Sequence, residues 1–264
     1  MQNRVVIVTG ASRRIAIGAA IARRAVAEGA AVLLHSWVPH DAEQPWGADV
    51  GGPEALVDEL RREGGRVEHV SADLGDPAAP AALVAAAREV FGHVDAVVAN
   101  HARSSSQWLE DLTAAELDLS YAVNTRATLL LVKAFAAQHD DSRSGGRVLL
   151  FTSGQYHDAM PAELPYIASK AALHEVTRSL AVHLIHRGIT VNCINPGPND
   201  TGYADDQARA AVATEPRGAL EHPHRHRPPG RVAAQRRSRL DHRPDHRLRR
   251  RLVGAMTPPA PYSG

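Results

Sequence analysis

The chain has 264 residues, enough for one large domain or two small ones, and its 44% apolar and 22% charged content is ordinary for a folded, water-soluble protein. Cys193 is the only cysteine, which excludes an intrachain disulfide, and no apolar stretch is long enough to span a bilayer. The first residues show no secretory signal, so we expect a cytoplasmic protein, and the net charge of +1 hides a strongly basic C-terminal segment.

Short apolar runs alternate with alanine-rich segments of helical length. The apolar runs are rich in β-branched residues and predict strands buried on both faces, at 4–8, 31–34, 66–70, 94–99, 147–151 and 189–194. The segments between them predict helices at 16–28, 53–63, 80–91, 113–139 and 166–187, with a surface loop at 37–52. Because strand and helix alternate, we expect an α/β fold with one doubly wound parallel sheet, in a single domain over residues 1–216.

The first predicted strand ends in a glycine-rich turn, TGASRRIAIG at residues 9–18. A turn of this kind between a strand and a helix lets backbone N–H groups and the helix N-terminus face a pyrophosphate. Gly10 and Gly18 are present, but Ala16 stands where a middle glycine is usual. The turn indicates a dinucleotide site, with a plain strand-to-helix connection as the alternative.

Three residues suited to proton transfer follow the fifth predicted strand. Ser153 stands at the strand end, and Tyr166 and Lys170 are four positions apart on the next predicted helix, so that their side chains share one face. An Asn-Pro-Gly turn follows the sixth strand at 195–197. Lys170 is one of only two lysines among 30 basic residues, which indicates a role for a compact ammonium group.

Together these motifs resemble the short-chain dehydrogenase/reductase (SDR) family over about residues 3–203, and most of all its 3-oxoacyl-[acyl-carrier-protein] reductase branch. Asn124, Ser153, Tyr166 and Lys170 match the four catalytic residues of that family. The resemblance implies a Rossmann-like fold, no metal, and a nicotinamide cofactor held by Gly10, Ser12, Arg13, Arg14, Ile17, Gly18, Asp73, Leu74, Asn100, Tyr166, Lys170, Pro196, Gly197 and Thr201. It places Gln155, His157 and Met160 in the substrate pocket, and it implies a homodimer or homotetramer.

The residue types fit a hydride transfer between the cofactor and a carbonyl or alcohol. A tyrosine hydroxyl has a pKa of about 10, and a nearby ammonium group favours the phenolate, so Lys170 is expected to lower the pKa of Tyr166. Ser153 is expected to hydrogen-bond the substrate oxygen. The resemblance implies that Lys170 also holds the nicotinamide ribose and that Asn124 holds a water that relays protons from Lys170.

The choice between NADP(H) and NAD(H) depends on the second strand. An acidic residue at its end would bind the ribose 2′-hydroxyl of NAD, and the chain has LLHSW there, with no acid. Arg13 and Arg14 lie in the glycine-rich turn, where a guanidinium can pair with a 2′-phosphate. The sequence therefore favours NADP(H), with NAD(H) as the alternative. Ala16 and Ala102 stand where glycine would let the backbone approach the cofactor more closely.

The basic segment, residues 217–264, does not continue the family pattern. It holds 12 arginines against three acidic residues, a net charge of +9, which leaves −8 for the first 216 residues. Alternating histidines at 222–226 lack companion cysteines or acids, which argues against a metal site, and the arginines lack interleaved aromatics, which argues against stacking on single strands. One back-translation of 220–253, shifted by one base, reads as the missing last helix and seventh strand. We interpret the segment as an out-of-frame reading, expected to be disordered.

Two other functions follow from this segment. Loss of the seventh strand and the usual subunit contact would give a catalytically impaired nucleotide-binding protein of the same fold. A basic arm could instead bind nucleic acid, which would show as a steep salt dependence of DNA binding that is lost when the chain is cut after Gly218.

Deleting one base near the Gly218 codon should restore the family ending and raise thermal stability, because an edge strand would gain a neighbour. The melting temperature and the solution mass of the two proteins measure this, and the restored protein should form a defined homotetramer. If the chain as printed is equally stable and already forms a defined oligomer through residues 219–251, the out-of-frame interpretation is wrong.

Overall fold

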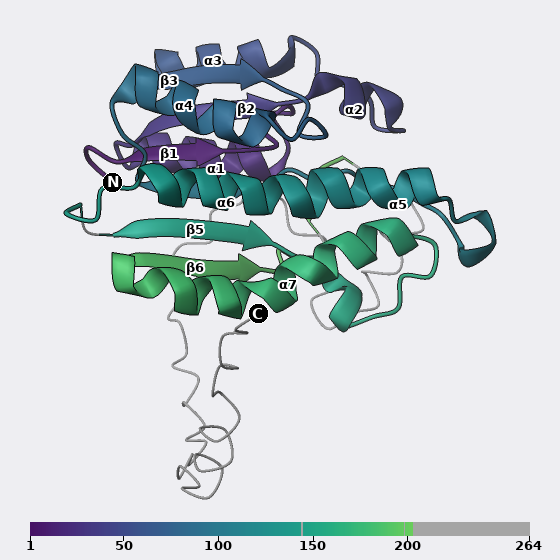
Figure 1. Ribbon diagram of the computed structural model, residues 1–264. Helices are drawn as coiled ribbons and strands as arrows, with labels where there is room; N and C mark the ends of the chain where they lie inside the picture. The colour runs from purple at the N-terminus through teal and green to yellow at the C-terminus, as the bar shows by residue number, and fades with distance from the viewer. Residues whose placement is uncertain (144, 198, 203–264) are drawn as a thin grey trace, which may run out of the picture. The chain divides into compact units, whose positions relative to one another are not determined.

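The computed structural model describes residues 1–143, 145–197 and 199–202, and the basic segment at 217–264 lies outside them. Six parallel strands form one sheet in the order β3-β2-β1-β4-β5-β6 (Figure 1). Their bounds are β1 (Val5–Val8), β2 (Ala31–Ser36), β3 (Val67–Ser71), β4 (Ala96–Ala99), β5 (Gly146–Phe151) and β6 (Ile189–Ile194). The predicted doubly wound parallel sheet is confirmed.

The strands at the centre of the sheet have no polar face. Every residue of β1, β2 and β4 is buried, which is why these segments read as continuous apolar runs rather than as alternating patterns. β6 is different, because its pairing partner in the described residues is β5 alone and Ile194 is 41% exposed. In the described part of the chain, β6 is therefore an edge strand.

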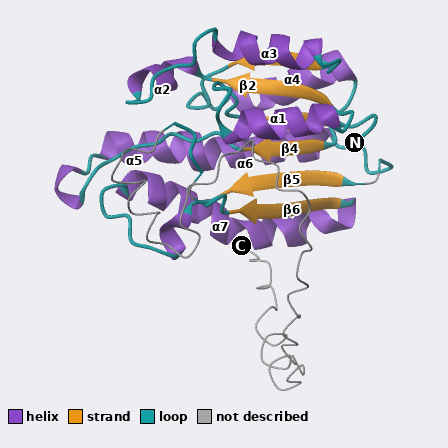
Figure 2. Ribbon diagram, turned by 180° about the vertical axis from the view of Figure 1, so that it is seen from behind, coloured by secondary structure: helices purple, strands orange, loops and turns teal. Residues whose placement is uncertain are grey.

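Helices cover both faces of the sheet (Figures 1 and 2). Their bounds are α1 (Ile17–Ala27), α2 (Val38–Glu43), α3 (Gly52–Arg62), α4 (Ala79–Phe91), α5 (Ala114–Ser120), α6 (Ala127–Gln138) and α7 (Leu164–Leu184), with short turns at η1 (Leu109–Asp111), η2 (Tyr121–Arg126), η3 (Gly154–Tyr156) and η4 (Ile185–Arg187). The prediction of a loop over 37–52 is wrong, because this segment contains α2. The single helix expected over 113–139 is interrupted at η2, a π-helical turn.

Two apolar cores hold these layers together. Leu83 of α4, Phe135 of α6 and Leu184 of α7 pack in one core, and α1 and α3 supply the other through residues such as Ala22 and Leu60. Full burial of one such leucine or phenylalanine contributes roughly 1.5–3 kcal/mol. No helix among the described residues is long and apolar enough to cross a membrane.

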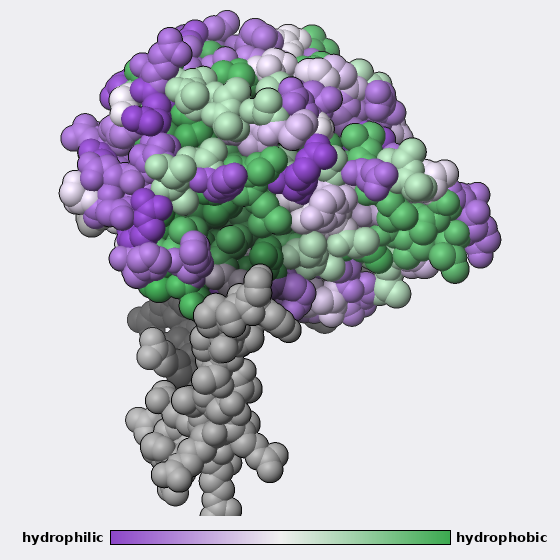
Figure 3. Space-filling view, viewed as in Figure 1, coloured by the Kyte–Doolittle hydropathy of each residue, from purple (hydrophilic) through white to green (hydrophobic). Residues whose placement is uncertain are grey.

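Apolar side chains also gather on the surface around α5, toward one end of the molecule in Figure 3. Trp108, Leu109 and Tyr121 are more than half exposed there, and Val182 of α7 is 69% exposed. Exposed apolar groups of this size are typical of a surface that contacts another protein.

The arrangement of strands fixes where a ligand can bind. The strand order reverses between β1 and β4, and in open parallel sheets the crevice outside the carboxyl ends of the strands at that reversal is the binding place. The glycine-rich turn follows β1 and Ser153 follows β5, so both lie at this edge of the sheet.

Candidate active site

The glycine-rich turn packs directly on the end of β4. Gly10 has a φ of +71°, and a Cβ added there would lie 2.7 Å from the Cα of His101, so only glycine fits. The Nδ2 of Asn100 donates to the carbonyls of Thr9 at 3.1 Å and Gly10 at 3.0 Å. These contacts hold the turn so that the N-terminus of α1 faces the crevice.

A cavity of about 1340 Å³ opens at the carboxyl ends of the strands. Most of the residues that the sequence assigned to cofactor and substrate line it, namely Gly10, Ser12, Arg13, Ile17, Asp73, Leu74, Asn100, Ser153, His157, Met160, Tyr166, Lys170, Pro196, Gly197 and Thr201. Four do not, namely Arg14, Gly18, Asn124 and Gln155. Gly18 has a packing role instead, because a Cβ there would strike the amide of Asn100 at 2.9 Å.

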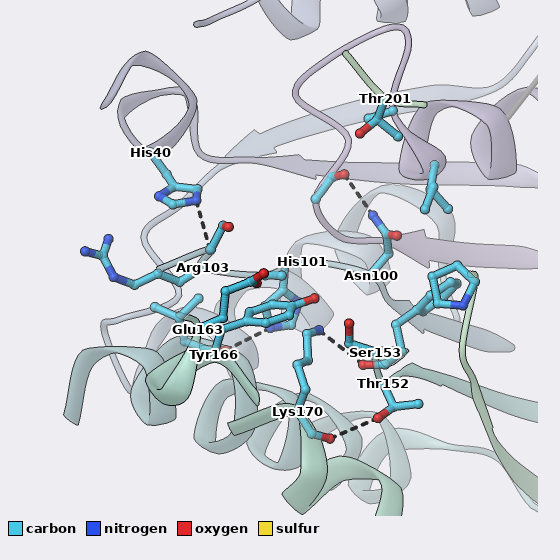
Figure 4. Close-up of a pocket in the computed structure, with 18 of the residues that line it drawn as sticks. His40, Asn100, His101, Arg103, Thr152, Ser153, Glu163, Tyr166, Lys170 and Thr201 are labelled. Atoms are coloured by element: carbon cyan, nitrogen blue, oxygen red, sulfur yellow. Dashed lines mark hydrogen bonds between the residues drawn. The ribbon is translucent and has the colours of Figure 1, made fainter. Parts of the chain in front are cut away.

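Three of the four predicted catalytic side chains converge. Figure 4 shows the hydroxyl of Tyr166, the hydroxyl of Ser153 and the ammonium group of Lys170 directed into the same part of the cavity. Pro165 lies in the first turn of α7, where its missing N–H costs nothing, and it starts the helix that carries Tyr166 and Lys170. The Lys170 ammonium group and the Ser153 and Tyr166 hydroxyl groups are thus three hydrogen-bond donors at one part of the cavity.

Lys170 is almost completely withdrawn from water, with 2% of its surface exposed. Its Nζ donates to the carbonyl of Phe151 at 3.1 Å, at the end of β5. Burial lowers the pKa of Lys170 from 10.5 to about 8, because desolvation disfavours the charged form. The ammonium group therefore still holds its proton at neutral pH, but it loses it at a lower pH than an exposed lysine does.

Asn124 is buried and is not among the residues that line the cavity. Its Oδ1 accepts from the Arg103 N–H at 2.6 Å, and its Nδ2 donates to the hydroxyl of Ser169 at 2.8 Å. The Ser169 hydroxyl in turn donates to the carbonyl of Tyr166 at 2.7 Å. The Asn124 side chain thus ties the π-helical turn η2 to the helical turn of α7 that carries Tyr166.

The substrate end of the cavity is formed by η3 and the segment after it. His157 and Met160 line it, and the His157 ring lies 4.2 Å from the ring of Tyr156. Gln155 is turned aside, because its Nε2 donates to the hydroxyl of Thr152 at 3.0 Å. The expected pocket position of Gln155 therefore differs from where the structure places its amide.

The two arginines of the glycine-rich turn have different surroundings. Arg13 lines the cavity, lies 3.5 Å from a carboxylate oxygen of Asp41 and stacks over the ring of Trp46. Arg14 is exposed outside the cavity, and its Nε donates to Asp49 at 2.9 Å. Only Arg13 is placed to reach a ligand in the cavity.

Asp41 is the acidic residue that sequence reasoning missed. The end of β2 itself has no acid, but α2 folds back so that Asp41 accepts a hydrogen bond from the hydroxyl of Ser12 and pairs with Arg13. Its signal in the sequence is weak, because it lies five residues beyond the strand, inside the segment expected to be a loop.

Two buried histidines flank Gly10. His35 Nδ1 accepts from the Gly10 N–H at 3.3 Å, and His101 Nε2 lies 3.0 Å from the carbonyl of Val123 in the π-helical turn. Burial lowers the pKa of both, to about 4 for His35, so both rings are neutral at physiological pH. Their hydrogen bonds hold Gly10 and the neighbouring π-helical turn in place. Because the rings are neutral, they add no positive charge there.

The chemistry of the lining fits a nicotinamide dinucleotide. The first N–H groups of α1 have no partner within the helix and suit a pyrophosphate. His40 and Trp46 line the same cavity, and His40 Nδ1 and Trp46 Nε1 are buried without a hydrogen-bond partner in the described residues. Such orphaned groups are typical of a site completed by a ligand.

These features define a class of protein, a dinucleotide-binding oxidoreductase with a serine, a tyrosine and a lysine at one end of its cavity. The short chain dehydrogenase family model matches residues 4–211. The chain belongs to that family.

Similar proteins agree with this assignment. An uncharacterized oxidoreductase YjdA of Bacillus subtilis (strain 168) is 35% identical over 209 residues, which cover 79% of this chain and 80% of that protein. A solved dehydrogenase/reductase from Sinorhizobium meliloti 1021 is 34% identical with a TM-score of 0.73, over 84% of each chain. A short chain dehydrogenase from Burkholderia cenocepacia J2315, solved in complex with NADP, is 32% identical with a TM-score of 0.74, over 84% of this chain and 86% of that one.

Replacing Lys170 by Met should stabilise the cofactor-free protein at pH 7, because the buried charge is removed. A fall in pKa from 10.5 to about 8 corresponds to a cost on the order of 3 kcal/mol, at roughly 1.4 kcal/mol per unit. Below pH 8 both the folded and the unfolded chain hold the proton, so the whole cost is present. Between about pH 8 and 10.5 only the unfolded chain holds it, so wild-type stability rises with pH and the gain should shrink.

Denaturant unfolding across this pH range measures the effect. Lys133→Met is the matched control, because Lys133 is the other lysine and is exposed on α6. The Phe151 carbonyl lines the cavity, so water can replace the lost donor. A Lys170→Met protein that is no more stable than wild type at pH 7 would contradict the burial cost.

Proposed function

We propose that the protein is an NADP(H)-dependent carbonyl reductase or alcohol dehydrogenase. The observation that carries this proposal is the convergence of the Ser153 hydroxyl, the Tyr166 hydroxyl and the Lys170 ammonium group in the cavity that the glycine-rich turn borders. The resemblance to the 3-oxoacyl-[acyl-carrier-protein] reductase branch suggests 3-oxoacyl thioesters as one substrate to test. The exposed apolar side chains around α5 support a homo-oligomer.

In carbonyl reduction, the bound nicotinamide cofactor supplies the hydride that reaches the carbonyl carbon. The Ser153 and Tyr166 hydroxyls donate hydrogen bonds to the carbonyl oxygen, where negative charge develops as the hydride arrives. Tyr166 then gives its proton to that oxygen. In alcohol oxidation the same groups act in reverse, and Tyr166 takes the proton from the substrate hydroxyl.

Lys170 helps Tyr166 to give a proton in carbonyl reduction and to take one in alcohol oxidation. Its positive charge favours the phenolate over the phenol, which brings proton transfer closer to neutral pH. Burial strengthens this effect, because the charge acts through a medium of low polarity. We also propose that Asn124 supports the proton route by holding the turn of α7 through Ser169, rather than by facing the cavity with its amide.

The preference for NADP(H) rests on Arg13. A guanidinium at the rim of the glycine-rich turn can bind the 2′-phosphate bidentately, and the solved Burkholderia relative carries NADP. Asp41 opposes this, because its carboxylate occupies Arg13 and would repel a phosphate. With NAD(H), the same carboxylate could accept a hydrogen bond from the ribose 2′-hydroxyl. The preference is therefore the outcome of a competition for Arg13.

Replacing Tyr166 by Phe should abolish carbonyl reduction, because the ring stays in place while the proton donor is lost. A fall in kcat of roughly a hundredfold or more is expected for loss of a general acid. Steady-state oxidation of NADPH with a ketone measures the rate, and cofactor fluorescence measures binding, which should be largely retained. A Tyr166→Phe protein with full activity would contradict the proposed role of Tyr166 as the proton donor.

Wild-type protein should bind NADPH more tightly than NADH. Arg13→Ala should lower the affinity for NADPH by roughly ten- to a hundredfold, the usual range for one charge-assisted hydrogen bond. The affinity for NADH should stay nearly unchanged. Asp41→Asn should raise the affinity for NADPH, because the Arg13 guanidinium loses its carboxylate partner. Arg14→Ala is the matched comparison, since Asp49 already holds that side chain outside the cavity. Equal affinities of wild type for the two cofactors would overturn the preference.

A further inference from the structure

A second acidic residue lies close to the proposed reaction centre. Glu163 immediately precedes α7 and lines the same cavity as Tyr166, three residues further on (Figure 4). Its backbone is held firmly, because its N–H donates to the Met160 carbonyl at 3.1 Å and the Leu164 N–H donates to the Gln107 carbonyl at 3.3 Å. Glu163 is therefore a fixed part of the cavity wall.

The Glu163 carboxylate has no hydrogen-bond or ion-pair partner among the described residues. Arg103 also lines the cavity, but its guanidinium is bound to Glu116 through two hydrogen bonds of 2.8 Å. Burial raises the pKa of Glu163, and nothing in the described residues offsets this desolvation. An acid held in this way gains most from a donor brought by the ligand.

The cations that line the cavity are already engaged elsewhere. Arg13 faces Asp41, Arg103 is bound to Glu116, and the Lys170 ammonium group donates to the Phe151 carbonyl. A second carboxylate, Asp158, also lines the cavity. The cavity around Glu163 therefore disfavours a substrate with a second negative group and favours one with a hydrogen-bond donor.

We propose that Glu163 is a specificity-determining residue that accepts a hydrogen bond from a hydroxyl or ammonium group of the carbonyl substrate. This inference rests on the proposed carbonyl reduction and narrows it to a substrate class. The substrate oxygen faces Ser153 and Tyr166, and the donor group of the same molecule reaches Glu163. A carboxylate at the donor's position is rejected by charge repulsion.

Four acetophenones that differ only at the para position test this assignment. Hydroxymethyl and aminomethyl groups offer a neutral and a charged donor, methyl offers none, and carboxylate is the repelled group. For wild type, kcat/KM should be at least about tenfold higher with either donor than with methyl, since a site built for a hydroxyl rejects the analogue that lacks it. The two donor substrates also show whether a hydroxyl or an ammonium group is preferred.

Glu163→Gln should reduce the aminomethyl-to-methyl ratio by roughly tenfold or more, and should relieve the rejection of the carboxylate. Glu89→Gln is the matched control, because it removes the same charge from an exposed position on α4 that does not line the cavity. Ratios are compared within each variant, so a general loss of activity does not imitate the effect.

The outcomes separate this inference from the proposed function. If wild type reduces the series but Glu163→Gln leaves all ratios unchanged, Glu163 does not determine specificity. If Glu89→Gln shifts the ratios as much as Glu163→Gln, the effect belongs to net charge, and the assignment is wrong. If wild type binds NADPH and reduces none of these ketones or a 3-oxoacyl thioester, the proposed function fails and the inference fails with it.

Discussion

The structure around the reaction centre depends on keeping the Lys170 ammonium group out of water. A charge buried to this extent needs a fixed acceptor, and the Phe151 carbonyl at the end of β5 supplies it. That contact holds only if α7 keeps its position against the sheet. The Thr152 hydroxyl donates to the Lys170 carbonyl, and Asn124 holds Ser169 one residue earlier. Sheet and helix are thus joined at the residue whose charge the chemistry uses.

In the proposed function, the other end of the cavity would have to attract a polyanion, the phosphate groups of the cofactor. Buried His35 and His101 are neutral and give only hydrogen bonds, so the attraction falls to helix N–H groups and Arg13. Arg13 already has a carboxylate partner in Asp41. A phosphate must displace that partner to be bound, and the affinity gained is the difference between two ion pairs. In the proposed function, Asp41 would lower the affinity for a 2′-phosphate and raise the affinity for a 2′-hydroxyl.

The sequence predicted the sheet well, because strands buried on both faces are continuous apolar runs. The sequence also predicted that Ser153, Tyr166 and Lys170 lie close together. Ser153 follows the end of a strand, and Tyr166 and Lys170 are four positions apart on the next helix. The sequence did not predict Asp41 or the separation of Arg13 from Arg14. Those depend on how the segment over 37–52 folds back, which no local periodicity encodes. The sequence did not predict the π-helical turn that contains Asn124 either, because hydrogen bonds to other parts of the chain stabilise this turn.

Lys170 and Glu163 lie in one cavity with Tyr166, and desolvation moves the pKa of each toward its neutral form. Desolvation favours loss of a proton from Lys170 and uptake of one by Glu163, yet no hydrogen bond or ion pair joins these two side chains in the described residues. In the proposed function, a bound substrate would have Lys170 near its carbonyl oxygen and Glu163 at a second point. Two fixed charges of opposite sign orient a bound molecule that carries complementary groups at both points. We therefore propose that the burial of both groups makes the site selective for a substrate that carries complementary groups at these two points.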